Sequence, residues 1–366
     1  MDQKLRVGIL GGTGMVGQRF ISLLENHPWF EVACIAASPR SAGKTYEEAI
    51  GSRWKMTKPM PEAVKKIVVQ DVSAVKDVAG QVDFVFSAVD MTKEEIKRIE
   101  EEYAKTETPV VSNNSAHRWT PDVPMVVPEL NPEHFQVIEA QKKRLGTTRG
   151  FIAVKPNCSI QSYTPALTAL IKKGFQPKTV VATTYQAISG AGKTFKDWPE
   201  MEHNIIPYIG GEEEKSEQEP LRIWGHIEIG EIVKAEGPVI TTQCIRVPVL
   251  DGHTAAVFVT FEEGKKPTKE QILDAWKEFS GLPQELKLPS APKQFIQYLE
   301  EPDRPQVSLD VDYENGFGVS MGRLREDTVF DYKFIGVSLI TVRGAAGGAL
   351  LTAELLTAQK YITAKK

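Results

Sequence analysis

Cysteine, long apolar runs and a surplus of positive charge are all scarce in this chain of 366 residues. Its three cysteines, Cys34, Cys158 and Cys244, are an odd number at scattered spacing, which excludes a full disulfide framework and a paired-cysteine metal site. We therefore expect a reducing compartment and no bound metal. The 44 Lys and Arg are outnumbered by 48 Asp and Glu, so the positive surplus that nucleic acids and anionic membranes attract is missing.

No stretch of the sequence has the roughly eighteen uninterrupted apolar residues of a membrane helix. The first apolar run, 5–10, is also too short for a secretion signal. We therefore expect a cytoplasmic protein that acts on small molecules and has no nucleic-acid or membrane partner. At about 150 residues per domain, the length predicts two domains that can each bury a core.

The first 155 residues alternate strand-like and helix-like segments, which predicts a doubly wound, Rossmann-like parallel sheet of the α/β class. A helix is expected over 93–105, where Thr92 and Glu95 form a capping-box pattern. Continuous apolar runs, typical of strands buried on both faces, occupy 5–11, 31–38, 66–71, 82–89, 109–113 and 151–154.

From about residue 151 the pattern changes to longer segments in which apolar and polar residues alternate. Strands are expected at 178–189, 240–250, 253–262 and 330–341. This alternation predicts an α+β domain with a mixed or antiparallel sheet, one face of which is covered by helices such as 269–280. A small-residue helix, from about 345 to 366, is expected to pack back on the first domain.

A glycine-rich turn follows the first expected strand and opens a helix. Gly11, Gly14 and Gly17 are spaced G-x-x-G-x-x-G, a variant of the usual dinucleotide-binding pattern. Such a turn lets backbone amides approach a pyrophosphate at the positive end of the helix. A tight turn without a ligand is the alternative, but the strand before and the helix after favour a dinucleotide.

The residues after the second expected strand predict which dinucleotide binds. NAD-binding proteins place an acid there to contact the ribose hydroxyls, whereas this chain has Ser38, Arg40 and Ser41 and no acid until Glu47. Hydroxyls and a guanidinium favour the 2′-phosphate of NADP. The alternative is that Arg40 is only a solvated loop residue. We therefore expect 1–155 to be an NADP-binding domain and 156–344 to be the catalytic and dimerisation domain, and a long mixed sheet favours a homodimer or homotetramer.

Cys158 is the candidate nucleophile, because it lies between an apolar strand and a helical run. A helix N-terminus stabilises a thiolate, which is the reactive form. The alternative is a structural cysteine, the role expected for Cys34 and Cys244 inside their strands.

His253 is the candidate acid or base that serves this thiol. Asp251-Gly252 resembles a two-residue hairpin turn, which would place Leu250 opposite His253 and Arg246 opposite Val257. Arg246 and His253 would then project from one face about 13 Å apart. A surface histidine at a strand end is the alternative.

Two further clusters carry polar side chains that could bind anions. Residues 112–118 (SNNSAHR) end the fifth strand, where ligands of doubly wound sheets bind. Glu212 and Lys215 lie three residues apart, on one face of a helix if that segment is helical. Either cluster could instead be a solvated loop or a surface ion pair.

The motifs together resemble those of the aspartate-semialdehyde dehydrogenase family, in its archaeal and fungal branch. The resemblance covers nearly the whole chain and rests on GGTGMVGQRF, SNNSAHRW, VVPELNP, KPNCS, TTYQAISGAGK, GEEEK, RVPVLDGHT and RGAAGG, in the family's order. It implies NADPH-dependent reduction of L-4-aspartyl phosphate to L-aspartate 4-semialdehyde, a step in lysine, threonine and methionine biosynthesis.

The resemblance also implies a role for each candidate residue. Cys158 would be the nucleophile and His253 the acid and base. Substrate and phosphate would be bound by Gln186, Arg246, Glu212, Arg118, Lys215 and Asn114. NADP would contact Gly11, Thr13, Gly14, Met15, Val16, Ser38, Arg40, Ser41, Ser87 and Gly190. In the bacterial branch a late polar side chain approaches the nicotinamide, but here that stretch is 344–348 (GAAGG), so only backbone could serve.

Three other functions remain open on this scaffold. N-acetylglutamyl-phosphate reductase is disfavoured, because an acetylated substrate has no ammonium for Glu212 to meet. Malonyl-CoA reductase is harder to separate from this branch by sequence. A non-catalytic NADP sensor, in which Cys158 would be incidental, is the third.

Overall fold

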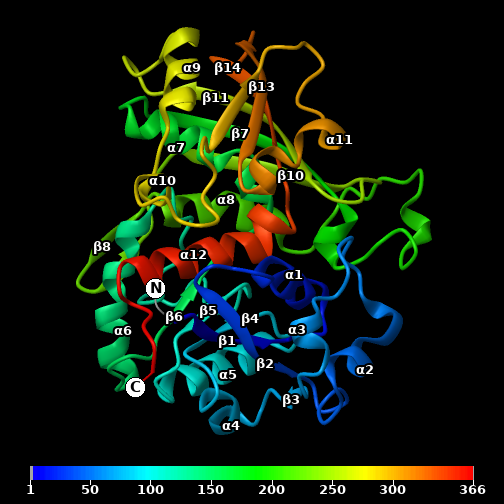
Figure 1. Cartoon of the computed structure of the whole chain (residues 1–366). Coiled ribbons are helices and arrows are strands. Elements are labelled where there is room, and N and C mark those ends of the chain that lie inside the picture. The colour runs from blue at the N-terminus through cyan, green and yellow to red at the C-terminus, as the bar shows by residue number, and fades with distance from the viewer. Residues whose placement is uncertain (1–2, 366) are drawn as a thin grey trace.

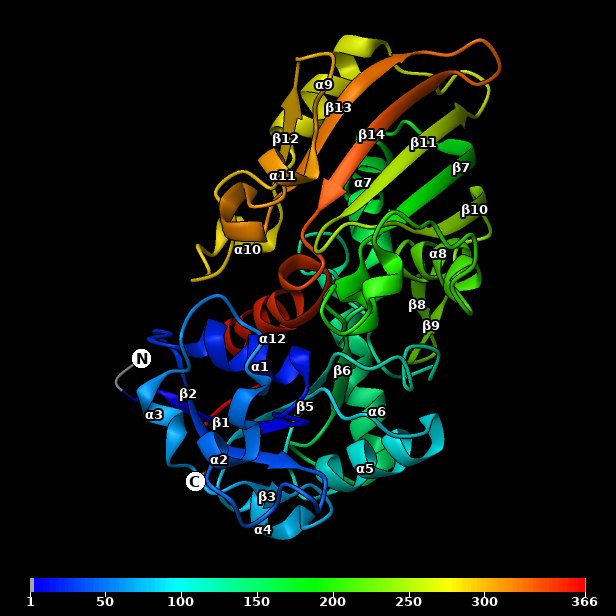
Figure 2. The ribbon, with the colours of Figure 1, turned by 90° about the vertical axis from the view of Figure 1, so that its right-hand side faces the viewer.

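The structure is a computed structural model that describes residues 3–365. It contains two six-stranded sheets at opposite ends of the molecule, and helix α12 (Gly347–Ala358) lies between them (Figures 1 and 2). Residues 1 and 2 of the expected first domain (1–155) and residue 366 of the expected last helix (about 345–366) lie outside the described residues. Within residues 3–365, no helix is both long enough and apolar enough to cross a membrane.

The first sheet is parallel throughout, and its order is β3-β2-β1-β4-β5-β6. This order is that of dinucleotide-binding folds, so the predicted doubly wound sheet is confirmed. The strands are β1 (Leu5–Leu10), β2 (Phe30–Ala37), β3 (Gln70–Asp71), β4 (Phe84–Ser87), β5 (Val110–Ser112) and β6 (Ile152–Val154). The strand expected over 66–71 keeps only two residues, because Val68 forms just an isolated bridge to Thr45.

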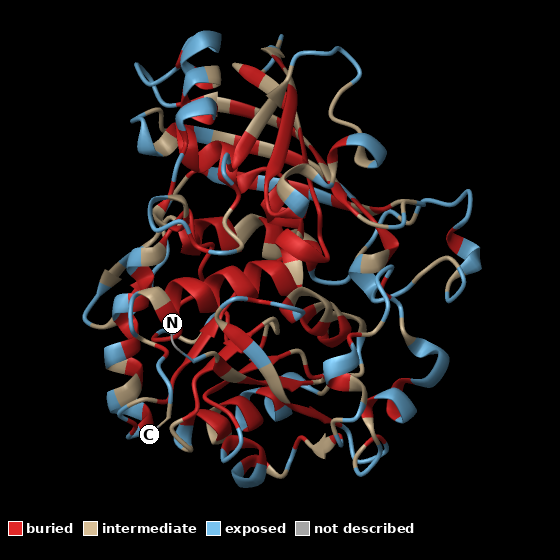
Figure 3. Cartoon of the chain, in the orientation of Figure 1, coloured by how far each residue is buried: buried red, intermediate tan, exposed pale blue. Residues whose placement is uncertain are grey.

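Helices cover both faces of this sheet: α1 (Met15–Leu24), α2 (Tyr46–Ile50), α3 (Glu62–Lys65), α4 (Val75–Ala79), α5 (Lys93–Lys105) and α6 (Ile138–Leu145). Helix α5 begins at the predicted capping box, in which Thr92 and Glu95 each accept the other's backbone N–H. Helix α12 is buried along most of its length (Figure 3). Its Leu350 and Leu351 share a core with Ile9 and Phe86 of the first sheet.

The second sheet is mixed, as expected, with the order β10-β7-β11-β14-β13-β12. Its outermost pairs, β10 with β7 and β12 with β13, are parallel, and the other pairs are antiparallel. The strands are β7 (Pro177–Gln186), β10 (Val239–Arg246), β11 (His253–Phe261), β12 (Ile296–Leu299), β13 (Val319–Glu326) and β14 (Tyr332–Ser338). A separate antiparallel pair consists of β8 (His226–Glu228) and β9 (Glu231–Val233).

The predicted hairpin is wrong. Strand β7 lies between β10 and β11 and pairs with both, so Arg246 does not face Val257. Residues Asp251 and Gly252 still turn the chain, and Gly252 has a φ of 97° that favours glycine. The turn joins two strands that have a third strand between them.

Helices of the second half are α7 (Thr164–Lys172), α8 (Glu212–Ile223), α9 (Lys269–Glu278), α10 (Leu282–Glu285) and α11 (Val307–Asp310). One face of the sheet is buried: Val180 of β7 and Val257 of β11 share a core with Leu167 of α7 and Trp276 of α9. The opposite side chains of the same strands, Tyr185 and Phe258, are at least partly exposed. The sheet therefore has one helix-covered face and one face open to solvent.

Candidate active site

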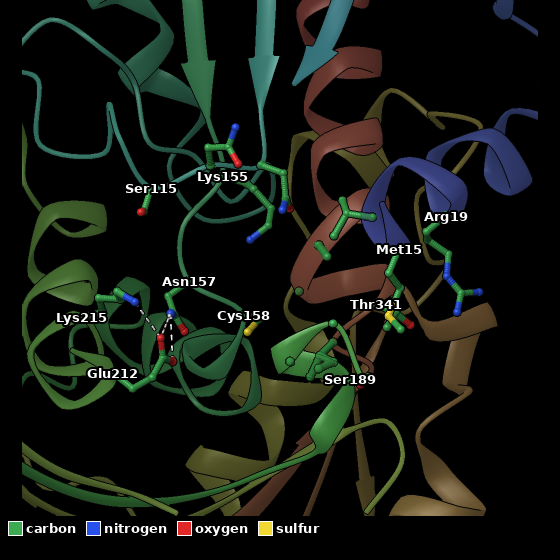
Figure 4. A pocket seen from close by; sticks show the side chains of 18 of the residues that line it. Met15, Arg19, Ser115, Lys155, Asn157, Cys158, Ser189, Glu212, Lys215 and Thr341 are labelled. Atoms are coloured by element: carbon green, nitrogen blue, oxygen red, sulfur yellow. Dashed lines mark hydrogen bonds and ion pairs between the residues drawn. The ribbon is translucent and has the colours of Figure 1, made fainter. Parts of the chain in front are cut away.

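A cavity of about 280 Å³ lies where the loops after β5 and β6 meet the second half of the chain (Figure 4). Both halves line it, through α1, the 113–118 loop, the residues around Cys158, α8 and the segment before α12. Eight predicted site residues line this cavity: Met15, Val16, Asn114, Arg118, Cys158, Gly190, Glu212 and Lys215. The structure thus brings together residues that are up to 200 positions apart in sequence.

Cys158 and His253 are in contact inside this part of the molecule. The distance from Cys158 Sγ to His253 Nε2 is 3.6 Å. The other ring nitrogen, Nδ1, accepts the backbone N–H of Ala187 at 3.0 Å. An amide can only donate, so the single proton of the neutral ring must be on Nε2. His253 therefore presents an N–H towards the sulfur.

The electrostatic environment keeps His253 neutral. Burial, with a smaller contribution from Arg246, lowers its pKa to about 3. Burial also raises the pKa of the Cys158 thiol, and Glu212 acts in the same direction, whereas Lys155, Arg118 and Arg246 oppose it. The expectation that a helix N-terminus activates this thiol is not supported. Cys158 precedes a single 3₁₀ turn (Ser159–Ser162), and α7 begins only at Thr164.

Arg246, Gln186 and His253 converge through three adjacent strands rather than through a hairpin. Arg246 is paired with Gln186 across β10 and β7, and β11 continues the row with Thr254 opposite Tyr185. A Cβ built on Gly190 would lie 2.9 Å from Arg246 Nη1 and 3.4 Å from His253 Nε2. The side chains predicted to share a site therefore do share it, but their geometry differs from the prediction.

One face of α8 lies against the residues around Cys158. Lys215 Nζ donates to Glu212 Oε1 at 2.8 Å, and Asn157 Nδ2 donates to both Glu212 oxygens at 3.1 and 3.0 Å (Figure 4). Gln186 Nε2 adds a contact at 3.4 Å. These donors hold the pKa of the buried Glu212 below its usual value, despite the opposing effect of burial. The buried Glu212 and the half-buried Lys215 thus form an ion pair in the cavity rather than on the surface.

Lys155 is a site residue that the sequence did not reveal. It is buried, lines the cavity with Cys158, and donates through Nζ to the carbonyl of Pro156. Burial and the neighbouring Arg118 lower its pKa to about 7. No pattern in the sequence distinguishes this lysine from an ordinary one at a strand end.

A second cavity, of about 340 Å³, lies beside the glycine turn. Gly11, Thr13, Gly14, Ser38 and Arg40 line it, as predicted for the cofactor, and Arg53 lines it without having been predicted. Ser41 and Ser87 are buried and line neither cavity. Arg53 comes from the segment after α2, which carries no recognisable motif.

The glycine turn fits the requirements of a pyrophosphate. Gly11 has a φ of 81°, and a Cβ there would lie 2.2 Å from the carbonyl oxygen of Ala88. A Cβ on Gly17 would lie 2.3 Å from the carbonyl oxygen of Gly11, so Gly17 permits close packing of α1. Gly14 precedes α1, whose first turn has no side-chain cap, and a Cβ on Gly14 would make only an ordinary contact, 3.6 Å, with the carbonyl oxygen of Gly11. Backbone N–H groups at this helix end can therefore meet an anion.

Comparisons with known proteins agree with this arrangement. Family models described as "Semialdehyde dehydrogenase, NAD binding domain" and "Semialdehyde dehydrogenase, dimerisation domain" match residues 6–138 and 167–341. An aspartate-semialdehyde dehydrogenase of Methanothermobacter thermautotrophicus is 43% identical over 96% of this chain and 99% of the relative. The chain belongs to the aspartate-semialdehyde dehydrogenase family. The Saccharomyces cerevisiae member is 41% identical over 99% of this chain and 100% of its own length.

Solved structures of aspartate-semialdehyde dehydrogenases have the same fold. The Candida albicans enzyme with NADP has a TM-score of 0.89 at 39% identity, and the match covers 98% of this chain and 100% of that one. A Vibrio cholerae aspartate-semialdehyde dehydrogenase has a TM-score of 0.72 at 26% identity, over 97% and 99%. The family resemblance seen in the sequence is therefore confirmed.

Proposed function

We propose that this chain performs the reaction of its family through Cys158. The reaction is the NADPH-dependent reduction of L-4-aspartyl phosphate to L-aspartate 4-semialdehyde, with release of phosphate. The observation that carries the proposed site is the Cys158–His253 contact of 3.6 Å beside a cavity that also presents Arg118, Glu212 and Lys215. The glycine turn and the cavity beside it would hold NADPH, which would supply the hydride.

The first step is attack by the Cys158 thiolate on the acyl carbon. A C–S bond forms, the bond from the acyl carbon to the phosphate oxygen breaks, and phosphate leaves with the electron pair. Arg118 and Lys215 provide positive charge for the leaving dianion, and Asn114 is placed to assist. Reduction of the resulting thioester gives a hemithioacetal, and its collapse returns the thiolate and releases the aldehyde.

His253 serves the tetrahedral steps as a hydrogen-bond donor. Its Nε2–H points towards the sulfur, so it also reaches an oxygen on the carbon attached to that sulfur. The bond from Ala187 to Nδ1 prevents the ring from taking the opposite tautomer. His253 can therefore stabilise the developing oxyanion by a hydrogen bond from Nε2, and collapse of the hemithioacetal oxyanion to aldehyde and thiolate then needs no net proton transfer.

Recognition of the amino acid is assigned to Arg246, Glu212 and Gln186. The Arg246 guanidinium is held by the carbonyl of Ala187 at 2.6 Å and suits a carboxylate. Both Glu212 oxygens already accept hydrogen bonds, one of them from Lys215. We infer that the substrate ammonium replaces the Lys215 amine at Glu212, which frees Lys215 to bind phosphate.

The phosphorylating reverse reaction tests this function. Reduction of NADP by aspartate semialdehyde should depend strongly on inorganic phosphate. If coenzyme A replaces phosphate, the malonyl-CoA reductase alternative is favoured instead. If the N-acetylated glutamate semialdehyde is the better substrate, the assignment of Glu212 to an ammonium is wrong.

The chain is also proposed to form a homodimer, or a homotetramer built from it. The second sheet has one open face, where Tyr185 and Val239 are exposed, and the matching family model is described as a dimerisation domain. Light scattering should give twice or four times the chain mass, and a monomer would contradict the proposal. We further propose the division into 1–155 and 156–344, and a cytoplasmic location that keeps the three free thiols reduced.

A further inference from the structure

Helix α8 presents a third side chain to the active site besides Glu212 and Lys215. Glu219 lies seven residues after Glu212, two helical turns along, on the same face. Its side chain is only 1% exposed. Neither the motifs of the sequence nor the proposed reaction uses it.

Both carboxylate oxygens of Glu219 are bonded to parts of the candidate site. Oε1 accepts Nη1 of Arg118 at 2.9 Å, and Oε2 accepts the backbone N–H of Asn157 at 2.5 Å. Arg118 is the proposed phosphate ligand, and Asn157 immediately precedes the nucleophile. One carboxylate therefore joins the leaving-group site to the backbone that carries Cys158.

The remaining bonds of the two partners limit their movement further. Arg118 Nε donates to the carbonyl of Lys155 at 3.0 Å, so its guanidinium is held from two sides. The Asn157 side chain accepts from the N–H of Ser159 at 2.7 Å, on the other side of Cys158. With Arg118 held at Nε and Nη1, the N–H groups of Nη2 keep only a long contact, 3.5 Å, to the carbonyl of Asn113. The Nη2 N–H groups are therefore the ones that can donate to an anion in the cavity.

Charge alone does not explain a carboxylate at this position. A negative group beside a phosphate-binding arginine weakens its attraction for a dianion. Apolar replacements of a buried ion pair are often neutral or stabilising, so a buried pair is weak evidence of a contribution to folding. The geometry is explained if the Glu219 carboxylate orients both Arg118 and the Asn157 backbone, because each of its oxygens accepts a hydrogen bond from one of them.

We propose that Glu219 is a positioning residue that fixes the phosphate-binding Arg118 and the backbone before Cys158 in one mutual arrangement. This inference rests on the proposed function of the site. Glu219 would then couple two steps of the reaction: bond making and breaking at the Cys158 sulfur, and the binding or release of phosphate at Arg118.

The test compares Glu219→Gln with Arg118→Lys and with Glu214→Gln, a control at an exposed position of the same helix. Two quantities are measured in the phosphorylating direction. One is the KM for inorganic phosphate. The other is the rate of the NADPH burst when enzyme, NADP and aspartate semialdehyde are mixed without phosphate, which reports chemistry at Cys158 alone.

Glu219→Gln should raise the phosphate KM and slow the burst, each by about tenfold, because the amide has a single acceptor oxygen: one partner loses its acceptor and the other keeps only an uncharged one. Arg118→Lys should change mainly the phosphate KM, and Glu214→Gln should change neither. The KM for NADP should stay within about twofold of wild type in all three variants, which a general loss of structure would not allow. If Glu219→Gln does not fold, Glu219→Asp, which is too short to reach both partners, should give the same paired effect.

Three results would overturn the inference. Glu219→Gln could leave both quantities at wild-type values, or change only the phosphate KM, and in either case the coupling is wrong while the proposed function stands. If the wild-type enzyme itself shows no dependence on phosphate, the proposed function fails and the inference fails with it.

Discussion

Replacing Gly344 with alanine should disturb the nucleophile directly. A Cβ at residue 344 would lie 2.7 Å from Cys158 Cβ and 3.1 Å from Cys158 Cα. Carbon atoms in contact normally lie about 3.5–4.0 Å apart, so the overlap is roughly 1 Å. The neighbouring atoms are the backbone and Cβ of the nucleophile rather than the end of a flexible side chain, so one of the two segments must move.

The magnitude follows from that overlap. Overpacking of this kind costs about 1–3 kcal/mol, and a displacement of about 1 Å at a reacting atom can cost about a hundredfold in rate. We expect kcat/KM for aspartate semialdehyde to fall by about 10- to 100-fold. The matched control is Gly210→Ala, whose Cβ would meet only the Tyr208 hydroxyl at 3.8 Å. Steady-state assays and fluorescence titration with NADPH separate chemistry from cofactor binding. If Gly344→Ala is as active as Gly210→Ala, the described approach of residue 344 to Cys158 is wrong.

Two further predictions concern the cofactor and a buried acid. Arg40→Ser and Arg53→Ser should each raise the KM for NADPH about tenfold or more and leave the KM for NADH nearly unchanged, because both arginines line the proposed cofactor cavity. If steady-state assays show equal effects on the two cofactors, neither arginine recognises the 2′-phosphate. Burial raises the pKa of Glu100 from 4.5 to about 6, so its contribution to folding is greatest below pH 4.5 and is lost as the pH rises through 6. Glu100→Gln should therefore gain up to about 2 kcal/mol of stability over wild type at about pH 8 and little at about pH 4, and denaturant unfolding with no such difference would contradict the shift.

Local signals in the sequence were sufficient for most of the fold. The capping box at Thr92 begins α5 in the structure, and α9 lies within the helix expected over 269–280. The apolar runs of the first half predicted the parallel sheet, because only strands buried on both faces lack polar alternation. The strand expected over 66–71 was too long, because Ile67 and Val69 hydrogen-bond to residues 43–46 and Val68 is exposed, which leaves only Gln70 and Asp71 in the sheet.

The hairpin prediction was wrong because the partner of a strand in a sheet can come from a distant part of the chain. Asp251-Gly252 does form a turn, but β7, which precedes both strands in the chain, occupies the space between them. Arg246 and His253 still lie in one site. Each strand is paired with β7 next to Gln186, and paired residues of neighbouring strands project from the same face of a sheet. Lys155, Arg53 and Glu219 could not be predicted for a related reason, since their roles depend on which distant segments surround them.

Mass spectrometry of the enzyme mixed with aspartate semialdehyde and NADP, in the absence of phosphate, tests covalent catalysis at Cys158. We expect an aspartyl thioester on Cys158 that disappears when phosphate is added. Cys158→Ala should show no adduct, bind NADPH normally and not turn over. An unmodified Cys158 in the active wild-type enzyme, or substantial turnover by Cys158→Ala, would contradict covalent catalysis at this residue.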